Sequence, residues 1–435
     1  MKGLTIDEDR VLALTRELVR IPSVPGGTGN GEAAAAERVR AELVDLGLRP
    51  QVAEVAPGRP NVLARLDSGR PGPVLLLEAH TDVVSEGDPS TWSHDPFGAE
   101  LAGGRIYGRG ACDTKENLAA ALCALRALRA AGRPRRGAVS FVSPVDEEGL
   151  MLGIKAFIRE GGAAGVTGAV ACEPVDGLAT LGTCARGGVR LAVRLHGRMT
   201  HGAVALAGAN PLVALGPLLT ALGDLQAEEA ARAGLHPLLG RFSLQPTVVR
   251  APIRGTPQLN VVPGNAEVLL DLRTVPGQDH AALTARVRDI AAGVALAMND
   301  SHRGGREAGW RREIGYPVLD PALRVEVEVL DDRGWVDLPA DDPLMAAATA
   351  AAAVVAVRPA APFGIPGTTD GSMLRNWAGV PVVVAGAGSV RQAHQADEWV
   401  DAGEPVGAAR MYAELALRYC EEGGDSGATG GGRFA

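Results

Sequence analysis

Short apolar runs without polar alternation constrain the fold of this chain most. Residues 74–77 are apolar at successive positions, so both faces of a strand formed there would be buried. Residues 138–142 and 168–172 are further runs of this kind. A helical stretch rich in Ala and Leu, residues 116–131, lies between the first two. The alternation predicts an α/β domain in which helices cover both faces of a mostly parallel central sheet.

The first part of the chain is expected to be helical. Thr5 and Glu8 fit a capping box that would begin the first helix. A second helix is expected over residues 31–46, and residues 52–66 offer strand material. Two helices and a strand region therefore precede the first buried strand.

The pattern changes near Arg186. Residues 189–195 alternate apolar and polar, as in an antiparallel strand with one exposed face. Further elements are expected at 211–225 and 280–298 as helices, and around Val248, at 268–272 and at 324–330 as strands. We predict a smaller α+β domain over 186–338, an antiparallel sheet plus two helices, inserted into an α/β domain made of 1–185 and 339–422. The Gly/Ser-rich tail 423–435 is expected to be disordered.

Composition excludes several classes of protein. The 435 residues suffice for two or three domain-sized units, and 46% are hydrophobic. A net charge of -8 argues against nucleic acid as a partner. The five cysteines are odd in number and include no C-x-x-C, which argues against a disulfide framework and a cysteine zinc site. No signal core or membrane-length apolar stretch is present, so we expect a cytoplasmic protein without a membrane partner.

Candidate metal ligands follow the predicted strands. Ligands of parallel α/β sheets bind outside the carboxyl ends of the strands, where sequence-distant turns can converge. Such turns carry His80 and Asp82 after 74–77, Glu147 and Glu148 after 138–142, and Glu173 after 168–172. Asp113 stands before the long helix, and His394 follows the apolar run 380–384.

These residue types favour a metal centre. Two histidines with several carboxylates and no cysteine suit zinc, with cobalt or manganese as alternatives, and they suffice for two ions sharing one carboxylate. The adjacent Glu147 and Glu148 repel each other, and one could bind metal while the other acts on water. Asp82, two residues after His80, could accept a hydrogen bond from the imidazole. The simpler alternatives are solvated glutamates and a histidine satisfied by its neighbour.

The chain resembles the co-catalytic zinc hydrolases that include acetylornithine deacetylase, succinyl-diaminopimelate desuccinylase, aminoacylase and glutamate carboxypeptidase. The resemblance covers nearly all of residues 11–400. The motifs that carry it are Leu-Glu-Ala-His-Thr-Asp at 77–82, Gly-Arg-Gly-Ala-Cys-Asp-Thr-Lys at 108–115, Asp-Glu-Glu-Gly at 146–149, Glu-Pro at 173–174, and His394 before Glu398.

This resemblance implies a site for two divalent ions, most simply Zn²⁺, with Asp113 bridging both. His80 and Glu173 would complete one site, and Glu148 and His394 the other. The fold it implies is a catalytic domain interrupted by a lid and dimerisation domain, which predicts a homodimer formed through the inserted domain.

The implied mechanism is metal-assisted amide hydrolysis. Glu147 would be the general base and acid, and Asp82 the partner of His80. The ions would lower the pKa of a bridging water, Glu147 would take its proton, and the hydroxide would attack the carbonyl. Glu147 would then pass the proton to the leaving amine.

Substrate contacts are implied by weaker matches. His201 resembles a family histidine that stabilises the oxyanion, often across a dimer interface, and the alternative is a surface histidine. Asn260 resembles a family asparagine near the substrate. Arg273 is positioned like the arginine that holds a substrate carboxylate, and the alternative is a structural salt bridge at a strand end.

Two further segments bear on the resemblance. Gly367 and Thr368 belong to a stretch, 367–372, that resembles a glycine-rich substrate loop, and the alternative is a helix N-terminus capped by Asp370. Lys115 is followed by Glu116, where the family often has glycine. An acidic residue is favoured at a helix start, and we expect this departure to affect only the rim of the site.

Competing functions fit less well. No G-x-S-x-G occurs, which argues against a serine hydrolase, and the glycines at 386 and 388 lack the third glycine and helix of a dinucleotide site. A non-catalytic relative is disfavoured because every ligand and Glu147 are present. Glu173 followed by Pro174 favours a deacylase. We therefore predict removal of an acetyl- or succinyl-type N-acyl group from an amino acid with a free carboxylate, with a metallo-exopeptidase as the alternative.

Overall fold

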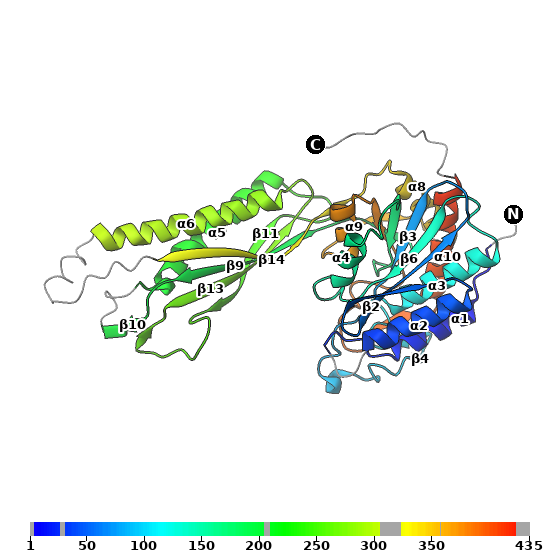
Figure 1. Cartoon of the computed structure of the whole chain (residues 1–435), viewed down its shortest axis with the longest axis horizontal. Coiled ribbons are helices and arrows are strands. Elements are labelled where there is room, and N and C mark those ends of the chain that lie inside the picture. The colour runs from blue at the N-terminus through cyan, green and yellow to red at the C-terminus, as the bar shows by residue number, and fades with distance from the viewer. Residues whose placement is uncertain (1–3, 27–30, 204–208, 305–322, 357, 423–435) are drawn as a thin grey trace. The chain divides into compact units, whose positions relative to one another are not determined.

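The computed structural model describes residues 4–26, 31–203, 209–304, 323–356 and 358–422. The chain divides into two compact units (Figure 1). The first combines Met1–Ala185 with Val336–Ala435, and the second is Arg186–Trp335. The second unit begins at the residue where the sequence pattern changes and ends just before the expected residue 338. The tail 423–435, predicted to be disordered, lies outside the described residues.

The first unit is built on a mixed sheet of nine strands. Four central strands, β6, β3, β7 and β17, are parallel, and antiparallel pairs flank them. In spatial order the strands are β1 (Gln51–Ala56), β2 (Arg59–Asp67), β6 (Ala138–Ser143), β3 (Val74–Glu78), β7 (Gly168–Ala171), β17 (Val382–Val384), β8 (Thr180–Ala185) and β15 (Val336–Asp337), with β16 (Ala361–Ile365) also pairing with β8. The expected parallel sheet is thus the centre of a mixed one.

Helices cover both faces of this sheet, which explains the unbroken apolar runs (Figure 1). One face packs against α1 (Glu8–Val19), α2 (Gly31–Asp45), α3 (Lys115–Ala130), α8 (Pro343–Val355) and α10 (Gly403–Leu417). The other face packs against α4 (Leu152–Arg159) and α9 (Asp370–Ala378). Leu77 lies in the first core and Leu76 in the second, so neighbouring residues of β3 serve opposite faces. A parallel strand covered on both faces therefore has no solvent-exposed face that would favour alternating polar residues.

The first helix starts later than the capping box predicts. α1 begins at Glu8, and Asp7 is its N-cap, with the Asp7 side chain accepting a hydrogen bond from Arg10 N at 3.0 Å. The prediction that Thr5 caps the helix and Glu8 closes the box is therefore wrong. Asp is as good an N-cap as Thr, and this start places acidic Glu8 and Asp9 in the first turn, where the helix dipole favours them.

A small three-stranded sheet accompanies the large one in the first unit. It is formed by β4 (Glu100–Ala102), β5 (Arg105–Tyr107) and β18 (Trp399–Asp401), with β5 in the middle. The pairing of β5 with β18 brings the segment before α3 to the segment after β17. Short helical turns complete the unit at η1 (Pro89–Thr91) and η3 (Arg418–Glu422).

The second unit is an antiparallel sheet with two helices, as the sequence predicts. Its order is β11 (Ser243–Arg250), β13 (Asn265–Thr274), β9 (Gly187–His196) and β14 (Arg324–Arg333). Its core joins alternate residues of β9 to the apolar sides of α5 (Pro211–Ala233) and α6 (His280–Gly304). Both helices extend beyond the ends expected at residues 225 and 298. A two-stranded pair, β10 (Thr200–His201) with β12 (Val261–Val262), lies apart from the main sheet.

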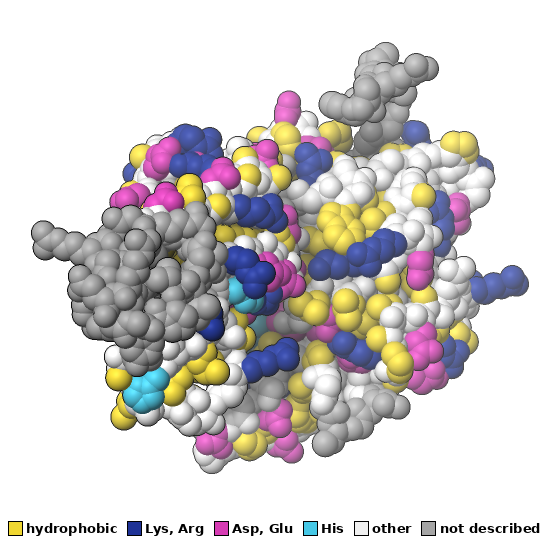
Figure 2. All heavy atoms as spheres, turned by 60° about the vertical axis from the view of Figure 1, so that its left-hand side comes forward, with side chains coloured by type: hydrophobic (Ala, Val, Ile, Leu, Met, Phe, Trp, Pro, Cys, Tyr) yellow, Lys and Arg dark blue, Asp and Glu magenta, His cyan; other side chains and the backbone are white. Residues whose placement is uncertain are grey.

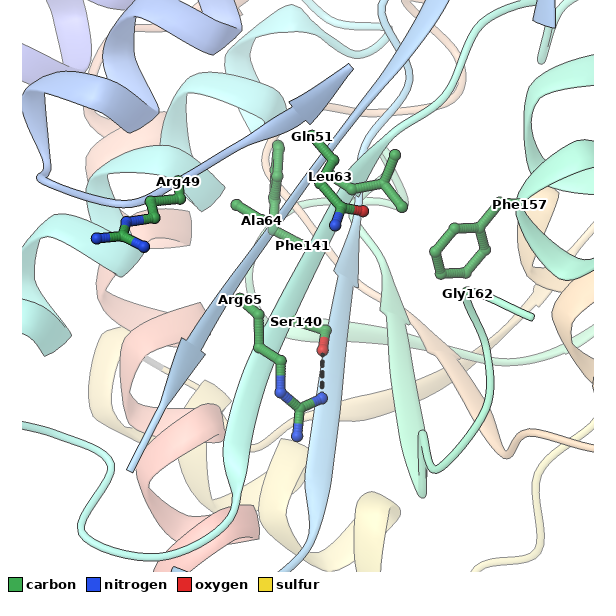
Figure 3. A pocket seen from close by; sticks show the side chains of 9 residues that line it. All are labelled: Arg49, Gln51, Leu63, Ala64, Arg65, Ser140, Phe141, Phe157 and Gly162. Carbon is green, nitrogen blue, oxygen red and sulfur yellow. Dashed lines mark hydrogen bonds between the residues drawn. The ribbon is translucent and has the colours of Figure 1, made fainter. Parts of the chain in front are cut away.

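Cavities on the described surface lie away from the candidate metal ligands. Figure 2 shows basic, acidic and apolar side chains interspersed on the visible face. A cavity of about 250 Å³ opens on the first unit beside β2 and α4, where Arg65 Nη1 donates to Ser140 Oγ at 3.2 Å and Phe157 forms a wall (Figure 3). None of the candidate metal ligands lines this cavity. Within the described ranges, no helix is both long and apolar enough to cross a membrane.

Candidate metal centre

Neighbouring parallel strands bring the candidate ligands to one edge of the large sheet. β6, β3, β7 and β17 are adjacent and parallel, so their carboxyl ends meet at the same edge. Main-chain hydrogen bonds continue the sheet past the strand ends, with Thr81 N donating to Pro144 O at 2.9 Å. The segments that follow these strands carry His80, Glu148, Glu173 and His394.

His80 lies between two carboxylates. Its Nε2 atom is 3.3 Å from Asp113 Oδ1 and 3.3 Å from Glu173 Oε1. On the other side of the ring, Nδ1 is 2.9 Å from the main-chain oxygen of Asp82 and 3.6 Å from Asp82 Oδ1. The carbonyl oxygen is therefore the acceptor that orients the imidazole, and not the carboxylate that the sequence suggests. With Nδ1–H donated to this carbonyl, Nε2 can offer its lone pair to a metal ion.

Asp113 presents its second oxygen to a second histidine. Asp113 Oδ2 lies 3.3 Å from His394 Nε2, and the same nitrogen is 2.8 Å from Glu148 Oε1. His394 adopts a left-handed backbone conformation, with φ of 65°, in the loop after β17. One oxygen of Asp113 thus faces each histidine, which is the arrangement expected of a carboxylate shared by two ions.

The atoms gathered here fit a divalent cation. Ligand atoms of His80, Asp113 and Glu148 all lie within 4.8 Å of one another. His80 Nε2 and Glu173 Oε1 are buried, and among the described residues neither has a hydrogen-bond partner. Buried polar atoms of this kind are costly unless something compensates them. Imidazole nitrogen and carboxylate oxygen are ligands that suit Zn²⁺, Co²⁺ or Mn²⁺.

The buried carboxylates of the cluster also favour a positive charge between them. Burial by itself lowers the pKa of His80, but the charges of Glu173 and Asp113 raise it well above its ordinary value. Hydrogen bonds to Asp113 and Glu148 raise the pKa of His394 to about 10. Burial raises the pKa of Glu173 to about 7. The excess of buried carboxylates therefore stabilises cations, whether protons on the histidines or metal ions between them.

Asp82 holds the main chain of the two adjacent glutamates. Its Oδ1 accepts the N–H of Glu147 at 3.0 Å, and its Oδ2 accepts the N–H of Glu148 at 3.1 Å. The two side chains then differ. Glu148 contacts His394, whereas the buried Glu147 carboxylate makes no hydrogen bond or ion pair with any described residue. Burial raises the pKa of Glu147 well above its ordinary value. Its carboxylate is therefore available to accept a proton.

A buried ion-pair network behind the glutamates was not predicted. Arg59 Nη2 donates to Asp146 Oδ1 at 2.6 Å and to Glu32 Oε1 at 3.0 Å, and Asp146 N donates to Glu32 Oε1 at 3.2 Å. Asp146 itself has a positive φ of 66°. The network fixes the strained turn that precedes Glu147. Its members come from α2, β2 and the turn after β6, so no local sequence pattern could have revealed it.

Comparison with known proteins adds the family. The model of the peptidase family M20/M25/M40 matches residues 76–418 of this chain. The chain belongs to this family. Curated relatives include the succinyl-diaminopimelate desuccinylase of Phenylobacterium zucineum, 30% identical over 93% of this chain and 97% of the relative. The desuccinylase of Gluconobacter oxydans is 34% identical over 67% of this chain and 74% of the relative. Membership makes the chain a metal-binding hydrolase of amide bonds.

Solved structures share the M20 fold with this chain. The aminopeptidase PepT of Bacillus cereus has a TM-score of 0.71 at 18% identity, covering 95% of this chain and 99% of its own. The YXEP protein of Bacillus subtilis, described as a dinuclear metal binding peptidase from the M20 family, has a TM-score of 0.66 at 19% identity and covers 95% of this chain and 98% of its own. At such identities the likeness establishes the two-unit fold and nothing finer.

The second unit carries three of the expected substrate residues. His201 pairs with Val261 between β10 and β12, so it lies beside the turn that contains Asn260. Both side chains are exposed, and His201 Nδ1 accepts the N–H of Ala203 at 3.0 Å. Arg273 behaves differently. Its Nε and Nη2 atoms bind Asp271 Oδ1 and Oδ2 at 2.6 and 3.1 Å, so the guanidinium is occupied by a neighbouring carboxylate.

The remaining residues of the M20 resemblance lie in the first unit. Gly367 and Thr368 form the connection from β16 to α9. Asp370 is the first residue of α9, and Thr369 is the N-cap, so the alternative in which Asp370 caps the helix is wrong. Glu116 lies in the first turn of α3, as expected, but its side chain is fully buried and does not line a rim.

Proposed function

We propose that this M20 family member is a metal-dependent amidohydrolase that removes an N-acyl group, of acetyl or succinyl type, from an amino acid or a related small carboxylate. The observation that carries the proposal is the contrast between two adjacent glutamates. Glu148 contacts His394 within a cluster of ligand atoms, while Glu147 stands beside that cluster with an unpaired, buried carboxylate. The desuccinylase names of the curated relatives support the choice of acyl group.

The chain offers two sets of ligands that share Asp113. His80 and Glu173 would complete one set, and Glu148 and His394 the other. When bound, two divalent ions, which we take to be Zn²⁺ with Co²⁺ or Mn²⁺ as alternatives, supply a Lewis acid that polarises the carbonyl and lowers the pKa of water.

Glu147 carries the proton in this mechanism. Its carboxylate takes a proton from the attacking water, and the water oxygen forms a bond to the carbonyl carbon. When the C–N bond breaks, Glu147 returns that proton to the leaving nitrogen, so the carboxylate ends the cycle as it began. Asp82 contributes by fixing the main chain of Glu147 and Glu148 through two N–H groups. Burial of the Glu147 carboxylate makes this proton exchange easier near neutral pH.

Residues outside the ligand cluster would recognise the substrate. His201 would donate to the oxyanion, with Asn260 beside it on the neighbouring turn. Arg273 would release Asp271 and bind the substrate carboxylate in its place, since the two carboxylates offer the same bidentate geometry. Gly367 and Thr368 would form a loop against the substrate. We further propose a homodimer formed through the second unit.

A cytoplasmic location is part of the same proposal. All five cysteines are buried free thiols, which suits a reducing compartment.

A substrate panel tests the proposal. Purified protein supplemented with Zn²⁺ or Co²⁺ would be assayed against N-acetyl, N-succinyl and N-formyl amino acids in parallel with dipeptides. We expect turnover of at least one acyl series, and loss of that turnover when the α-carboxylate is amidated. Turnover confined to dipeptides would replace the proposal by a metallo-exopeptidase, and turnover unaffected by amidation would remove Arg273 from its assigned role.

A further inference from the structure

A single buried carboxylate organises the loop that presents Asp113. Glu398 immediately precedes β18 and is fully buried. Its Oε1 atom accepts three main-chain N–H groups, from Gly110 at 3.0 Å, Cys112 at 2.9 Å and Asp113 at 3.1 Å. Its Oε2 atom accepts a hydrogen bond from Arg109 Nη1, and Arg109 is also buried. Within the described part of the chain, the hydrogen bonds of this side chain are therefore all made with one short stretch, residues 109–113.

The main chain adds a second attachment to the same loop. Gly108 N donates to the main-chain oxygen of Glu398 at 2.9 Å. The loop contains Gly108 and Gly110, both with positive φ, at 149° and 83°. A loop with such an irregular path cannot pair its N–H groups within a helix or sheet, so they need an outside acceptor. Glu398 is that acceptor for three of them.

The position of Glu398 in the chain gives these contacts a further consequence. It stands four residues after His394, and Asp113 is the last residue that it binds. The carboxylate therefore joins the two segments that carry the shared ligand and one of the histidines. Burying a charge is costly unless donors surround it, and a neutral residue could have filled this space more cheaply. A buried ion pair at this place is best explained by the geometry that it imposes.

We propose that Glu398, together with Arg109, is a positioning pair for the metal centre. The pair determines the position of the Asp113 carboxylate relative to His394, and it contacts neither substrate nor metal. The inference rests on the proposed function only in taking Asp113 and His394 as ligands. It predicts that metal affinity depends on hydrogen-bond polarity at residue 398 in an otherwise folded protein.

Replacement of Glu398 by glutamine separates polarity from shape. Glutamine has one acceptor oxygen and one NH₂ group, so it can face the three N–H groups or Arg109 correctly, but not both. In either orientation donors oppose donors. In the double variant Glu398→Gln with Arg109→Gln, the guanidinium donors that oppose the NH₂ group at position 398 are removed. The amide oxygen at 398 can then face the three main-chain N–H groups without opposed donors and without a buried charge.

The experiment measures Co²⁺ binding to metal-free protein by calorimetry and by the visible absorption of bound Co²⁺. We expect Glu398→Gln to weaken binding about 10- to 100-fold, as removal of an outer hydrogen-bond partner usually does. The double variant should recover most of that loss. Asp401→Asn is the matched control, because Asp401 pairs with Arg105 at 3.3 Å between the same two segments but at an exposed site. It should bind Co²⁺ as the wild type does.

The outcomes separate this inference from the proposed function. Wild-type affinity in a folded Glu398→Gln variant, or a double variant no better than the single one, overturns the positioning role and leaves the proposed function standing. A wild-type protein that binds no Co²⁺ overturns both. If circular dichroism shows that Glu398→Gln does not fold, Arg109→Gln is used in its place, because this variant keeps the three main-chain N–H bonds to Glu398. Unchanged affinity in that variant also overturns the positioning role.

Discussion

Replacing Asp82 with asparagine tests how the two adjacent glutamates are held. In the structure one Asp82 oxygen accepts the N–H of Glu147 and the other accepts the N–H of Glu148, at 3.0 and 3.1 Å. Asparagine has the same shape but only one acceptor oxygen. Its NH₂ group would therefore face one of the two N–H groups, and one hydrogen bond would be replaced by two opposed donors.

The size of the effect follows from these contacts. A hydrogen bond to a charged acceptor contributes about 1.5–3 kcal/mol, and its loss in a buried site leaves the donor unsatisfied. Each 1.36 kcal/mol corresponds to a factor of ten, so the correctly held turn would become about 10- to 150-fold less populated. His80 should keep its orientation, because its Nδ1 binds the main-chain oxygen of Asp82 at 2.9 Å, which the substitution leaves in place.

We therefore expect kcat to fall by up to this factor while the His80 side of the metal centre is preserved. The assay compares kcat at saturating metal with metal content by mass spectrometry, using the best acyl substrate from the panel. If Asp82→Asn instead lost metal and regained full kcat when metal was added in excess, the carboxylate would act on the imidazole. That result would refute the reasoning from the main-chain contacts.

Three further predictions concern the base, the metals and acid stability. Glu147→Gln should lower kcat by about 10²–10⁴ while both metals remain bound, and metal loss from that variant would show that the roles of the two glutamates are reversed. Chelation should abolish turnover, and Zn²⁺ or Co²⁺ should restore it; turnover that survives removal of all metal counts against the site. Burial opposes ionisation of Glu42, but hydrogen bonds from Arg10, Arg126 and Arg38 hold its pKa at about 2. Because the folded pKa is below the unfolded value, Glu42 should contribute up to about 3 kcal/mol above pH 4.5, and this contribution should disappear as the pH falls towards 2. Urea unfolding of wild type and Glu42→Gln at several pH values measures the difference, and an equal difference at every pH would contradict it.

The fold was largely readable from hydrophobic pattern. Apolar runs such as 74–77 predicted a strand buried on both faces, because a strand between two layers of helices has no exposed position for a polar residue. The alternation in 189–195 likewise predicted β9 as a strand with one exposed face. This change of strand pattern indicated that a different unit begins there. Element boundaries were less readable. Thr5 and Asp7 are both good caps, and the structure shows that Asp7 is the residue that caps α1.

The residues of the candidate site could be predicted from the sequence, but the contacts between them could not. Strand order places the ends of β6, β3 and β7 side by side, so residues that follow buried parallel strands had to approach one another. Arg273 shows the limit of such reasoning. The sequence left open a substrate contact or a salt bridge at the strand end, and the structure shows that Asp271, two residues away, binds its guanidinium.

The sequence by itself determined which residue types stand at the ends of the buried strands, and therefore that a cation-binding cluster could form there. Tertiary structure alone decided which partner each polar atom takes. The Asp82 carboxylate binds two main-chain N–H groups, whereas the His80 imidazole binds the main-chain oxygen of Asp82. The Glu398 carboxylate binds a loop nearly 290 residues away along the chain. The physical reason is that periodicity depends on neighbours within a helix or strand. Hydrogen-bond partners of buried carboxylates depend on where distant segments leave unpaired donors.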